Sequence, residues 1–345
     1  FGYILIMKNT ILFFLLFAAN TIYSQIKIDG KVNDNNKAPL FGASVYIDGT
    51  TIGTTTDENG SFAITVPINS NSVIVISYFG FASQYVDISK VKESLNIVLT
   101  EDVKALKEVV IQKSPFSRKQ MLEFFREQFL GTNTAGSNCI IENEDEIYFD
   151  YDIKNFVFKA YADKPLIINN KHLSYKISYQ LVDFKCEFYK ISLKDTEMLS
   201  SLYAGTSFFT EVSKENKFIK RRAASFQGSS LQLFRNLVAK KWGKEDFLLF
   251  EGKFMTNPDE HFTISEINSV YKVEVTKQNK SLTGKGFVAE FSVLHDKKEQ
   301  SKITFFTDTF FVDKFGVFSD YNLIYFSGDI AKRKIGDLLP SDYGL

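Results

Sequence analysis

Short runs of alternating apolar and polar residues, broken by turn residues, fill the chain from residue 26 to residue 99. Alternation over 26–32 and again over 62–66 places the apolar side chains on one face of each strand. Between these strands, Asn59 and Gly60 supply the positive-φ positions that a tight hairpin turn needs. No helical period intervenes, so the pattern predicts an antiparallel β-sandwich of about seven strands over residues 25–100.

From residue 115 onward the pattern mixes helical and strand periods. Ser114 and Pro115 predict a helix start, and apolar residues at helical spacing continue the helix to Gly131. Further helices are predicted over 229–242 and 329–339. Strands are expected over 147–161, 173–192, 247–254, 269–276, 286–294, 302–312 and 318–327. The sequence therefore predicts a β-rich α+β domain over 115–345, with mostly antiparallel strands and two or three helices, joined to the sandwich by a linker or last strand at 101–114.

The first 24 residues read as upstream sequence followed by a secretory signal peptide. Met7 and Lys8 precede an apolar run over 11–19, and Ser24 is a small residue at the cleavage position. The run is shorter than the roughly 20 residues that a membrane-spanning helix needs. We expect export to the periplasm or outer membrane of a Gram-negative envelope.

Composition narrows the classes further. The 41 basic and 41 acidic residues cancel, which excludes the broad positive field of a nucleic-acid-binding protein. Phe is abundant at 35 residues, which we attribute to AT-rich codon usage. Cys139 and Cys186 permit one disulfide in an exported protein, and two buried thiols are equally compatible with the sequence.

Four short motifs of the first domain carry a family resemblance. They are Gly30-Lys31-Val32, residues 39–45 (PLFGASV), residues 53–62 (GTTTDENGSF) and residues 76–81 (ISYFGF). Together they resemble the carboxypeptidase regulatory-like domain, which implies a transthyretin-like sandwich and an envelope setting but no activity. The segment after the domain is similar to the one that follows it in TonB-dependent receptors. The remaining residues, about 235, are too few for a plug and a 22-stranded barrel, so a complete receptor is excluded.

Metal chemistry finds little support in the sequence. A metallocarboxypeptidase needs His-x-x-Glu and a distant His, and none of His172, His261 and His295 has Glu three residues later. We therefore reject that activity. An acidic stretch over 142–152 offers oxygen ligands for calcium, but its spacing lacks the Asp-x-Asp-x-Asp-Gly loop. A solvated loop and strand face is the better interpretation.

One segment predicts a candidate binding site. Half of the six arginines, namely Arg221, Arg222 and Arg235, flank a helix start at Gly228-Ser229-Ser230. Free backbone amides at a helix start favour an anion, and arginine offers a planar fork that lysine lacks. The hypothesis is a pocket for a carboxylate, sulfate or phosphate. The alternative is internal pairing of these arginines with an ordinary Ser N-cap.

The function expected from the sequence is non-catalytic binding or assembly at the cell envelope. No nucleophile elbow, phosphate loop or dinucleotide fingerprint is present, and no cofactor is expected. Partners would be an envelope protein, a glycan or an anionic ligand, with outer-membrane association but no nucleic acid. Two alternatives stay open, a small outer-membrane β-barrel with a periplasmic sandwich and an envelope hydrolase. The looser pattern from Tyr175 to the C-terminus also resembles a group of uncharacterised exported proteins that carry the regulatory-like domain.

Overall fold

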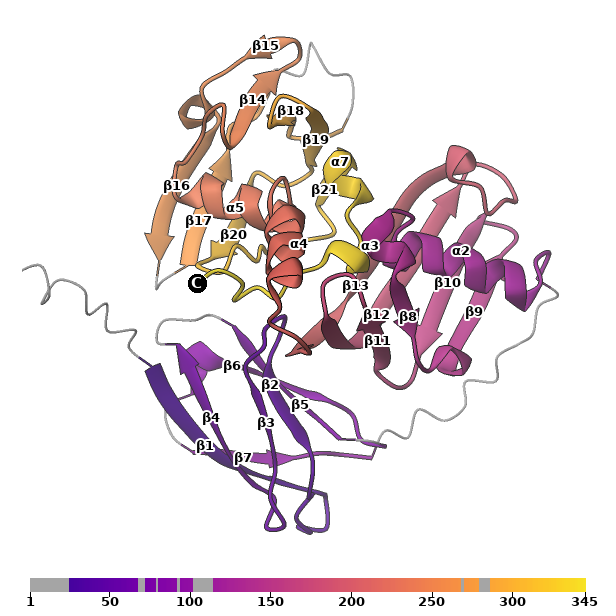
Figure 1. Ribbon diagram of the computed structural model, residues 1–345, viewed down its shortest axis with the longest axis vertical. Helices are drawn as coiled ribbons and strands as arrows, with labels where there is room; N and C mark the ends of the chain where they lie inside the picture. The colour runs from indigo at the N-terminus through magenta and orange to yellow at the C-terminus, as the bar shows by residue number, and fades with distance from the viewer. Residues whose placement is uncertain are drawn as a thin grey trace, which may run out of the picture.

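The structure is a computed structural model that describes residues 25–67, 72–78, 80–91, 94–101, 114–267, 270–278 and 286–345. The predicted signal peptide and most of the predicted linker lie outside these residues, so those boundaries stay predictions. Apolar side chains gather in three separate clusters, one in the N-terminal sandwich and two in the rest of the chain. Figure 1 shows the sandwich at the bottom and the other two parts above it.

The N-terminal part is a sandwich of two sheets, as predicted. One sheet has the strand order β4-β1-β7 and the other β3-β2-β5-β6. The strands are β1 Gln25–Asn33, β2 Ser44–Ile47, β3 Gly53–Thr55, β4 Ser61–Pro67, β5 Val73–Ser77, β6 Gln84–Asp87 and β7 Leu95–Val98. One pairing departs from the antiparallel expectation, because β7 runs parallel to β1 after the chain crosses over from the other sheet.

The turn at Asn59 and Gly60 forms, but it is not a hairpin. It joins β3 to β4, which belong to different sheets. Gly60 has φ of +71°, and a Cβ atom there would lie 2.5 Å from the carbonyl oxygen of Val32. The Asn-Gly signal therefore marks a corner between the two layers, where only glycine fits.

The second part is a six-stranded sheet covered on one face by α2, Arg118–Leu130 (Figure 1). Its strands are β8 Cys139–Ile141, β9 Ile147–Asp152, β10 Val157–Ala162, β11 Leu166–Asn170, β12 Tyr175–Phe188 and β13 Met198–Glu211. The helix starts later than predicted, since Ser117 rather than Ser114 is the N-cap and forms a capping box with Gln120. Gly131 ends it, as the sequence indicated.

The aromatic side chains of α2 pack into the core of this part. The rings of Phe125 and Phe184 lie 4.7 Å apart between centroids, and Phe124 meets Phe158 edge to face at 5.2 Å. Phe125 and Phe129 are fully buried. These side chains therefore form part of the core that α2 shares with the sheet.

The third part packs a five-stranded sheet, β15-β14-β18-β19-β21, against a three-stranded sheet, β16-β17-β20. The strands are β14 Phe247–Glu251, β15 Phe254–Met255, β16 Phe262–Ile267, β17 Val270–Val275, β18 Ala289–His295, β19 Glu299–Phe305, β20 Thr309–Asp313 and β21 Ile324–Gly328. Helix α5, Ser230–Val238, adds Leu233, Phe234 and Leu237 to the core.

Further helices complete the fold. They are α3 Thr134–Ser137, α4 Asn216–Phe226 and α7 Asp329–Lys332. The predicted helix over 329–339 is interrupted, since α7 is followed by a separate 3-10 turn at Ile335–Asp337. The sequence did not predict α4 or the long strand β13. Among the described residues, no helix has the length and apolar character needed to cross a membrane.

The sandwich is docked to the other parts by the turn between β2 and β3. The amide of Gly49 donates to the carbonyl of Ser207 at 2.7 Å, and the amide of Phe209 donates to the carbonyl of Thr50 at 3.0 Å. These two bonds add the turn to strand β13 as a short parallel bridge. The C-terminal residues close the contact, because the amide of Ser341 donates to the carbonyl of Gly49 at 2.6 Å.

Both cysteines are free thiols. In the sheet, Cys139 of β8 lies opposite Asn170 of β11, and Asn170 lies opposite Tyr175 at the start of β12. Cys186 lies near the far end of that strand, so the two are separated by roughly 35 Å at about 3.3 Å per residue. That distance exceeds the ~7 Å limit for the Cα atoms of a disulfide. Of the two alternatives, a disulfide or two free thiols, the structure therefore has the free thiols.

Candidate functional site

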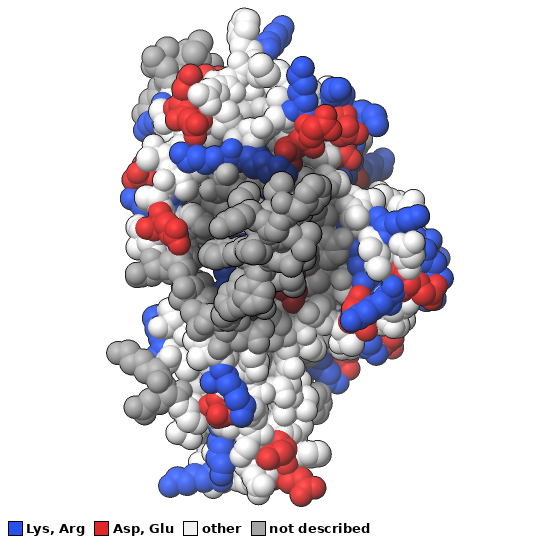
Figure 2. Space-filling view, turned by 60° about the vertical axis from the view of Figure 1, so that its left-hand side comes forward, with Lys and Arg blue, Asp and Glu red and all other residues white. Residues whose placement is uncertain are grey.

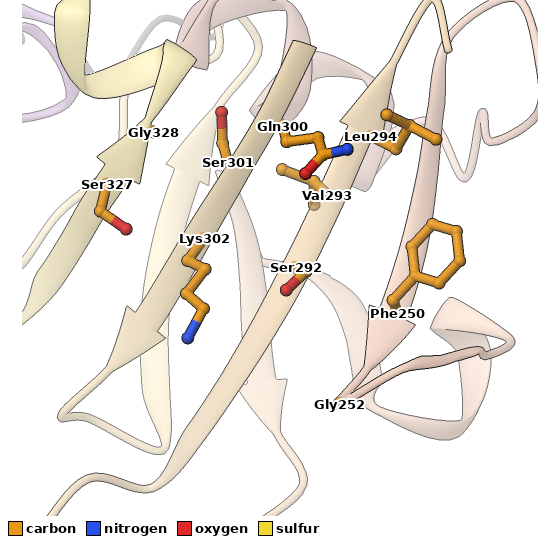
Figure 3. A pocket seen from close by; sticks show the side chains of 10 residues that line it. All are labelled: Phe250, Gly252, Ser292, Val293, Leu294, Gln300, Ser301, Lys302, Ser327 and Gly328. Atoms are coloured by element: carbon orange, nitrogen blue, oxygen red, sulfur yellow. The ribbon is translucent and has the colours of Figure 1, made fainter. Parts of the chain in front are cut away.

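A groove of about 450 Å³ lies on the outer face of the five-stranded sheet. A volume of this size falls within the ~300–1,000 Å³ range of small-ligand sites. Figure 3 shows its lining, which comes from β14 and the turn after it, β18, β19 and β21. The lining residues are Phe250, Gly252, Ser292, Val293, Leu294, Gln300, Ser301, Lys302, Ser327 and Gly328.

Strand register sets the order of side chains across the groove. Phe250 lies opposite Ser292, Ser292 opposite Lys302, and Lys302 opposite Ser327. Cross-strand partners project to the same face, so these four side chains form one row over four strands. Leu294 and Gln300 form the next row. The neighbouring residues Val293 and Ser301 alternate inward and are buried.

The chemistry of the groove is mixed. Phe250 and Leu294 supply apolar surface, while Ser292, Gln300 and Ser327 supply hydroxyl and amide groups. The ammonium of Lys302 is paired at 3.0 Å with a carboxylate oxygen of Glu290, so much of its charge is balanced within the protein. Such a surface can hold a ligand that has an apolar face and hydroxyl or amide edges.

No pattern in the sequence marks this groove. Its residues are ordinary outward positions of alternating strands, and no spacing distinguishes them from any solvated sheet face. Only the lateral order of β14, β18, β19 and β21 brings them into one row.

Arg222, one of the predicted anion-binding residues, is turned inward and is only 3% exposed. Its guanidinium donates to the carbonyls of Leu173 (2.8 Å), Ser174 (3.1 Å) and Ser213 (2.9 Å) and pairs with Glu211. The planar fork is thus used to join α4 to β12 and β13. The contacts of Arg222 are those of internal pairing, the alternative to the anion pocket.

Arg235 is also used internally. Its three nitrogens donate to the carbonyls of Phe315 (2.9 Å), Tyr343 (2.8 Å) and Ser341 (2.7 Å). Burial lowers the pKa of this guanidinium from its ordinary value. Arg235 therefore anchors the C-terminal residues on α5.

The predicted helix start at 228–230 exists and is capped by its own residues. Ser229 is the N-cap of α5 and accepts from the amide of Gln232 at 3.1 Å, while Ser230 is the first residue of the helix. The amide of Gly228 donates to the side chain of Gln232 at 2.7 Å. These polar groups are satisfied within the turn.

Gly228 packs against a charged cluster that the sequence did not indicate. With φ of +74°, it leaves no room for a Cβ atom, which would overlap a carboxylate oxygen of Glu299 and lie 3.0 Å from both Arg333 and His295. Arg333 pairs with Glu299 at 3.1 Å and also donates to the carbonyl of Ser225 in α4. This cluster fixes the corner between α4 and α5 onto the β18–β19 hairpin.

Arg221 is the one predicted arginine that borders a hollow. Its guanidinium donates to the carbonyl of His172 at 3.2 Å and lines a shallow cavity of about 270 Å³. Thr134, Ser225 and Asp337 share this cavity. Burial, and next the nearby charge of Arg221, lower the pKa of His172 from its ordinary value, so its imidazole is neutral at pH 7. Of the residues predicted to bind an anion, Arg221 is the one that lines this cavity.

The acidic stretch over 142–152 is paired with cations on neighbouring elements. Arg126 pairs with Glu144, Lys164 with Glu146 at 2.5 Å, and Lys176 with a carboxylate of Glu142 at 3.0 Å. These partners support the solvated strand face. Around the grey area in Figure 2, basic and acidic side chains are interspersed.

Comparison with known proteins places the sandwich in a family. Residues 28–111 match the CarboxypepD_reg-like domain, a regulatory and non-catalytic domain. TonB-dependent receptor SusC of Bacteroides thetaiotaomicron is 34% identical over 87 residues, which are 25% of this chain and 8% of the receptor. TonB-dependent receptor P3 of Formosa agariphila is 29% identical over 107 residues, 30% of this chain and 10% of that receptor. The chain therefore spans about a tenth of the length of these relatives, and the likeness confirms the family resemblance of the first domain.

Solved structures give a weaker likeness. A type II cohesin–X-dockerin complex from Acetivibrio cellulolyticus matches with a TM-score of 0.20 and 20% identity over 31% of this chain and 78% of that one. A 9R-lipoxygenase from Cyanothece matches with a TM-score of 0.19 and 10% identity over 64% of this chain and 49% of that one. At these scores the matches carry no functional argument.

Proposed function

We propose that this protein is a non-catalytic binding component of the bacterial cell envelope. The sandwich belongs to the domain found at the N-terminal regions of TonB-dependent receptors, and this likeness supports an outer-membrane or periplasmic location. The docked turn between β2 and β3 joins the sandwich to the larger parts. The sandwich then serves as a positioning module, and the binding surface lies on the parts after residue 114.

The groove on the five-stranded sheet is the proposed binding surface, and the row of side chains across four strands is the observation that carries it. A neutral glycan segment matches the lining, because sugar rings have an apolar face and hydroxyl edges. Phe250 and Leu294 would pack against the ring face. Ser292, Gln300 and Ser327 would hydrogen-bond to the edges.

A titration with chitotetraose, a neutral tetrasaccharide, tests this proposal. Ser292→Trp places an indole across the middle of the row and is expected to reduce affinity at least tenfold. Thr263→Trp is the matched control, since Thr263 is an exposed position in β16 on the sheet packed behind the groove. Equal affinities of the two variants, or no binding by the unmodified chain, would contradict the glycan assignment.

We also propose Arg221 as an anion contact, since it borders the smaller hollow. In the part of the chain that the structure describes, its one hydrogen bond goes to His172, which leaves N–H donors directed elsewhere. Titration with inorganic phosphate, followed by NMR, is expected to shift the amides around Thr134 and Ser225. Arg221→Gln should abolish these shifts, and their persistence would contradict the assignment.

A further inference from the structure

The contact between the sandwich and the six-stranded sheet contains a partly buried carboxylate. Asp48 lies in the turn after β2, and its Oδ1 accepts a hydrogen bond from the amide of Ser207 in β13 at 2.7 Å. Gly49 and Thr50, the next two residues, form the backbone bonds to β13. The carboxylate is therefore placed at the centre of the docking contact.

Ring packing and a second carboxylate surround this point. The rings of Tyr46 in β2 and Phe208 in β13 lie 5.2 Å apart between centroids. At the edge of the contact, Asp342 accepts from the hydroxyl of Thr51 at 2.7 Å. The docking contact thus combines backbone bonds, ring packing and two acids from opposite sides.

The groups that face Asp48 do not neutralise it. They are the hydroxyls of Tyr46 in β2, Tyr85 in β6 and Tyr179 in β12, together with the amides of Ser207 and Gly49. Burial raises the pKa of all three tyrosines, and that of Tyr46 reaches about 12, so they stay uncharged up to pH 8. Among the described residues no cation pairs with Asp48, so an ionised carboxylate there is held chiefly by the amide of Ser207.

We propose that Asp48 makes the docking of the sandwich onto β13 pH-dependent, so that the docked arrangement is held more tightly in mildly acidic surroundings than at neutral pH. A protonated carboxyl keeps its carbonyl oxygen as an acceptor for Ser207 and loses the charge that burial penalises. An ionised carboxyl regains water when the sandwich moves away. The inference rests on the docking contact and is independent of the ligand proposed for the groove.

The direction follows from proton linkage. Burial raises the pKa of Asp48 from 3.8 to about 6, although the amide of Ser207 opposes this rise. A group whose pKa is raised in the docked state stabilises docking below its free value and loses that contribution as pH rises through the raised value. Docking is therefore expected to weaken between about pH 4 and pH 6, by up to roughly 100-fold for two pKa units.

Amide hydrogen exchange in the full chain tests the proposal. Protection is measured at pH 5.0 and pH 7.5 for segments containing Ser207, Phe209 and Ser341, with the amides of α2 as the internal reference for intrinsic exchange. The unmodified chain should lose protection in these segments at pH 7.5. Asp48→Asn keeps the acceptor without the charge and should show equal protection at both pH values.

Asp29→Asn is the control, since Asp29 is an exposed aspartate of the same sandwich and should leave the pH dependence intact. The same pH-dependent loss in Asp48→Asn, or no loss in the unmodified chain, would overturn the proposal. If Asp48→Asn does not fold, an NMR titration of the Asp48 carboxyl carbon in the unmodified chain decides. A midpoint near pH 4 would overturn the proposal and one near pH 6 would support it.

Discussion

The carboxylate of Asp48 and the backbone amide of Ser207 are 159 positions apart in sequence and meet at 2.7 Å. This hydrogen bond joins the sandwich to strand β13, which the sequence pattern did not predict. The placement of the sandwich therefore depends on a partner strand that is identified only in the folded chain.

Gly228→Ala is expected to destabilise the fold strongly. The added methyl group meets Glu299, Arg333 and His295, and the backbone has φ of +74°. We expect a loss of roughly 2–4 kcal/mol in the free energy of unfolding, measured by chemical denaturation. Gly42→Ala is the control, since Gly42 has φ of +78° but open space around it, and should cost only about 1 kcal/mol. Equal losses in the two variants would show that the charged cluster does not constrain Gly228.

Arg222→Lys should destabilise the chain, whereas Arg221→Lys should not. Lysine cannot span the three carbonyls and Glu211 that the buried guanidinium of Arg222 joins. The expected loss is roughly 2–4 kcal/mol in the free energy of unfolding, against a change within about 0.5 kcal/mol for Arg221→Lys. A stable Arg222→Lys variant would return Arg222 to the list of candidate anion contacts.

Both thiols should resist alkylation in the folded chain. Burial raises the pKa of Cys139 to about 12 and that of Cys186 to about 11. Because the thiolate is the reactive form, reaction with iodoacetamide at pH 8 should be at least about 100-fold slower than for an exposed cysteine. Intact mass should show two added groups only after denaturation, without prior reduction. A requirement for a reductant would reveal a disulfide.

Local patterns in the sequence were sufficient for the sandwich and for α2. Alternation over residues 26–32 and 62–66 corresponds to β1 and β4, and Gly131 ends the helix as predicted. The Asn59-Gly60 turn was also found, but which strands it joins depends on sheet assignment, which no local pattern encodes.

Strand β13 was not predicted because its residues lack a clean alternation of apolar and polar side chains. Small side chains and Gly205 fill its middle, and most of its positions are half-buried on both faces. Its pairing with β12 over nearly the whole length supplies the order that the pattern lacks. Helix α4 was not predicted for a related reason, since its buried face is built from Arg222 and Ser225 rather than from apolar residues.

The candidate site was only partly accessible from the sequence. The scarcity of arginine drew attention to Arg222 and Arg235, but the acceptors of their guanidinium groups are internal carbonyls. Neither the groove nor the cluster at Gly228 has a sequence signature, since both arise where distant strands and turns meet.

An engineered disulfide between Gly49→Cys and Ser341→Cys tests the docking of the sandwich most directly. A Cβ atom at position 49 would lie 3.8 Å from that of Ser341, which is the mean separation in disulfides. The double variant should oxidise in air to an intramolecular bond, seen as a mass loss of about 2 Da with Cys139 and Cys186 still free. The control pairs Ser341→Cys with Gly42→Cys, another positive-φ glycine of the sandwich that has no neighbour within 4 Å, and should stay reduced. Docking through the β2–β3 turn would be contradicted if the first pair also stayed reduced or formed only intermolecular bonds.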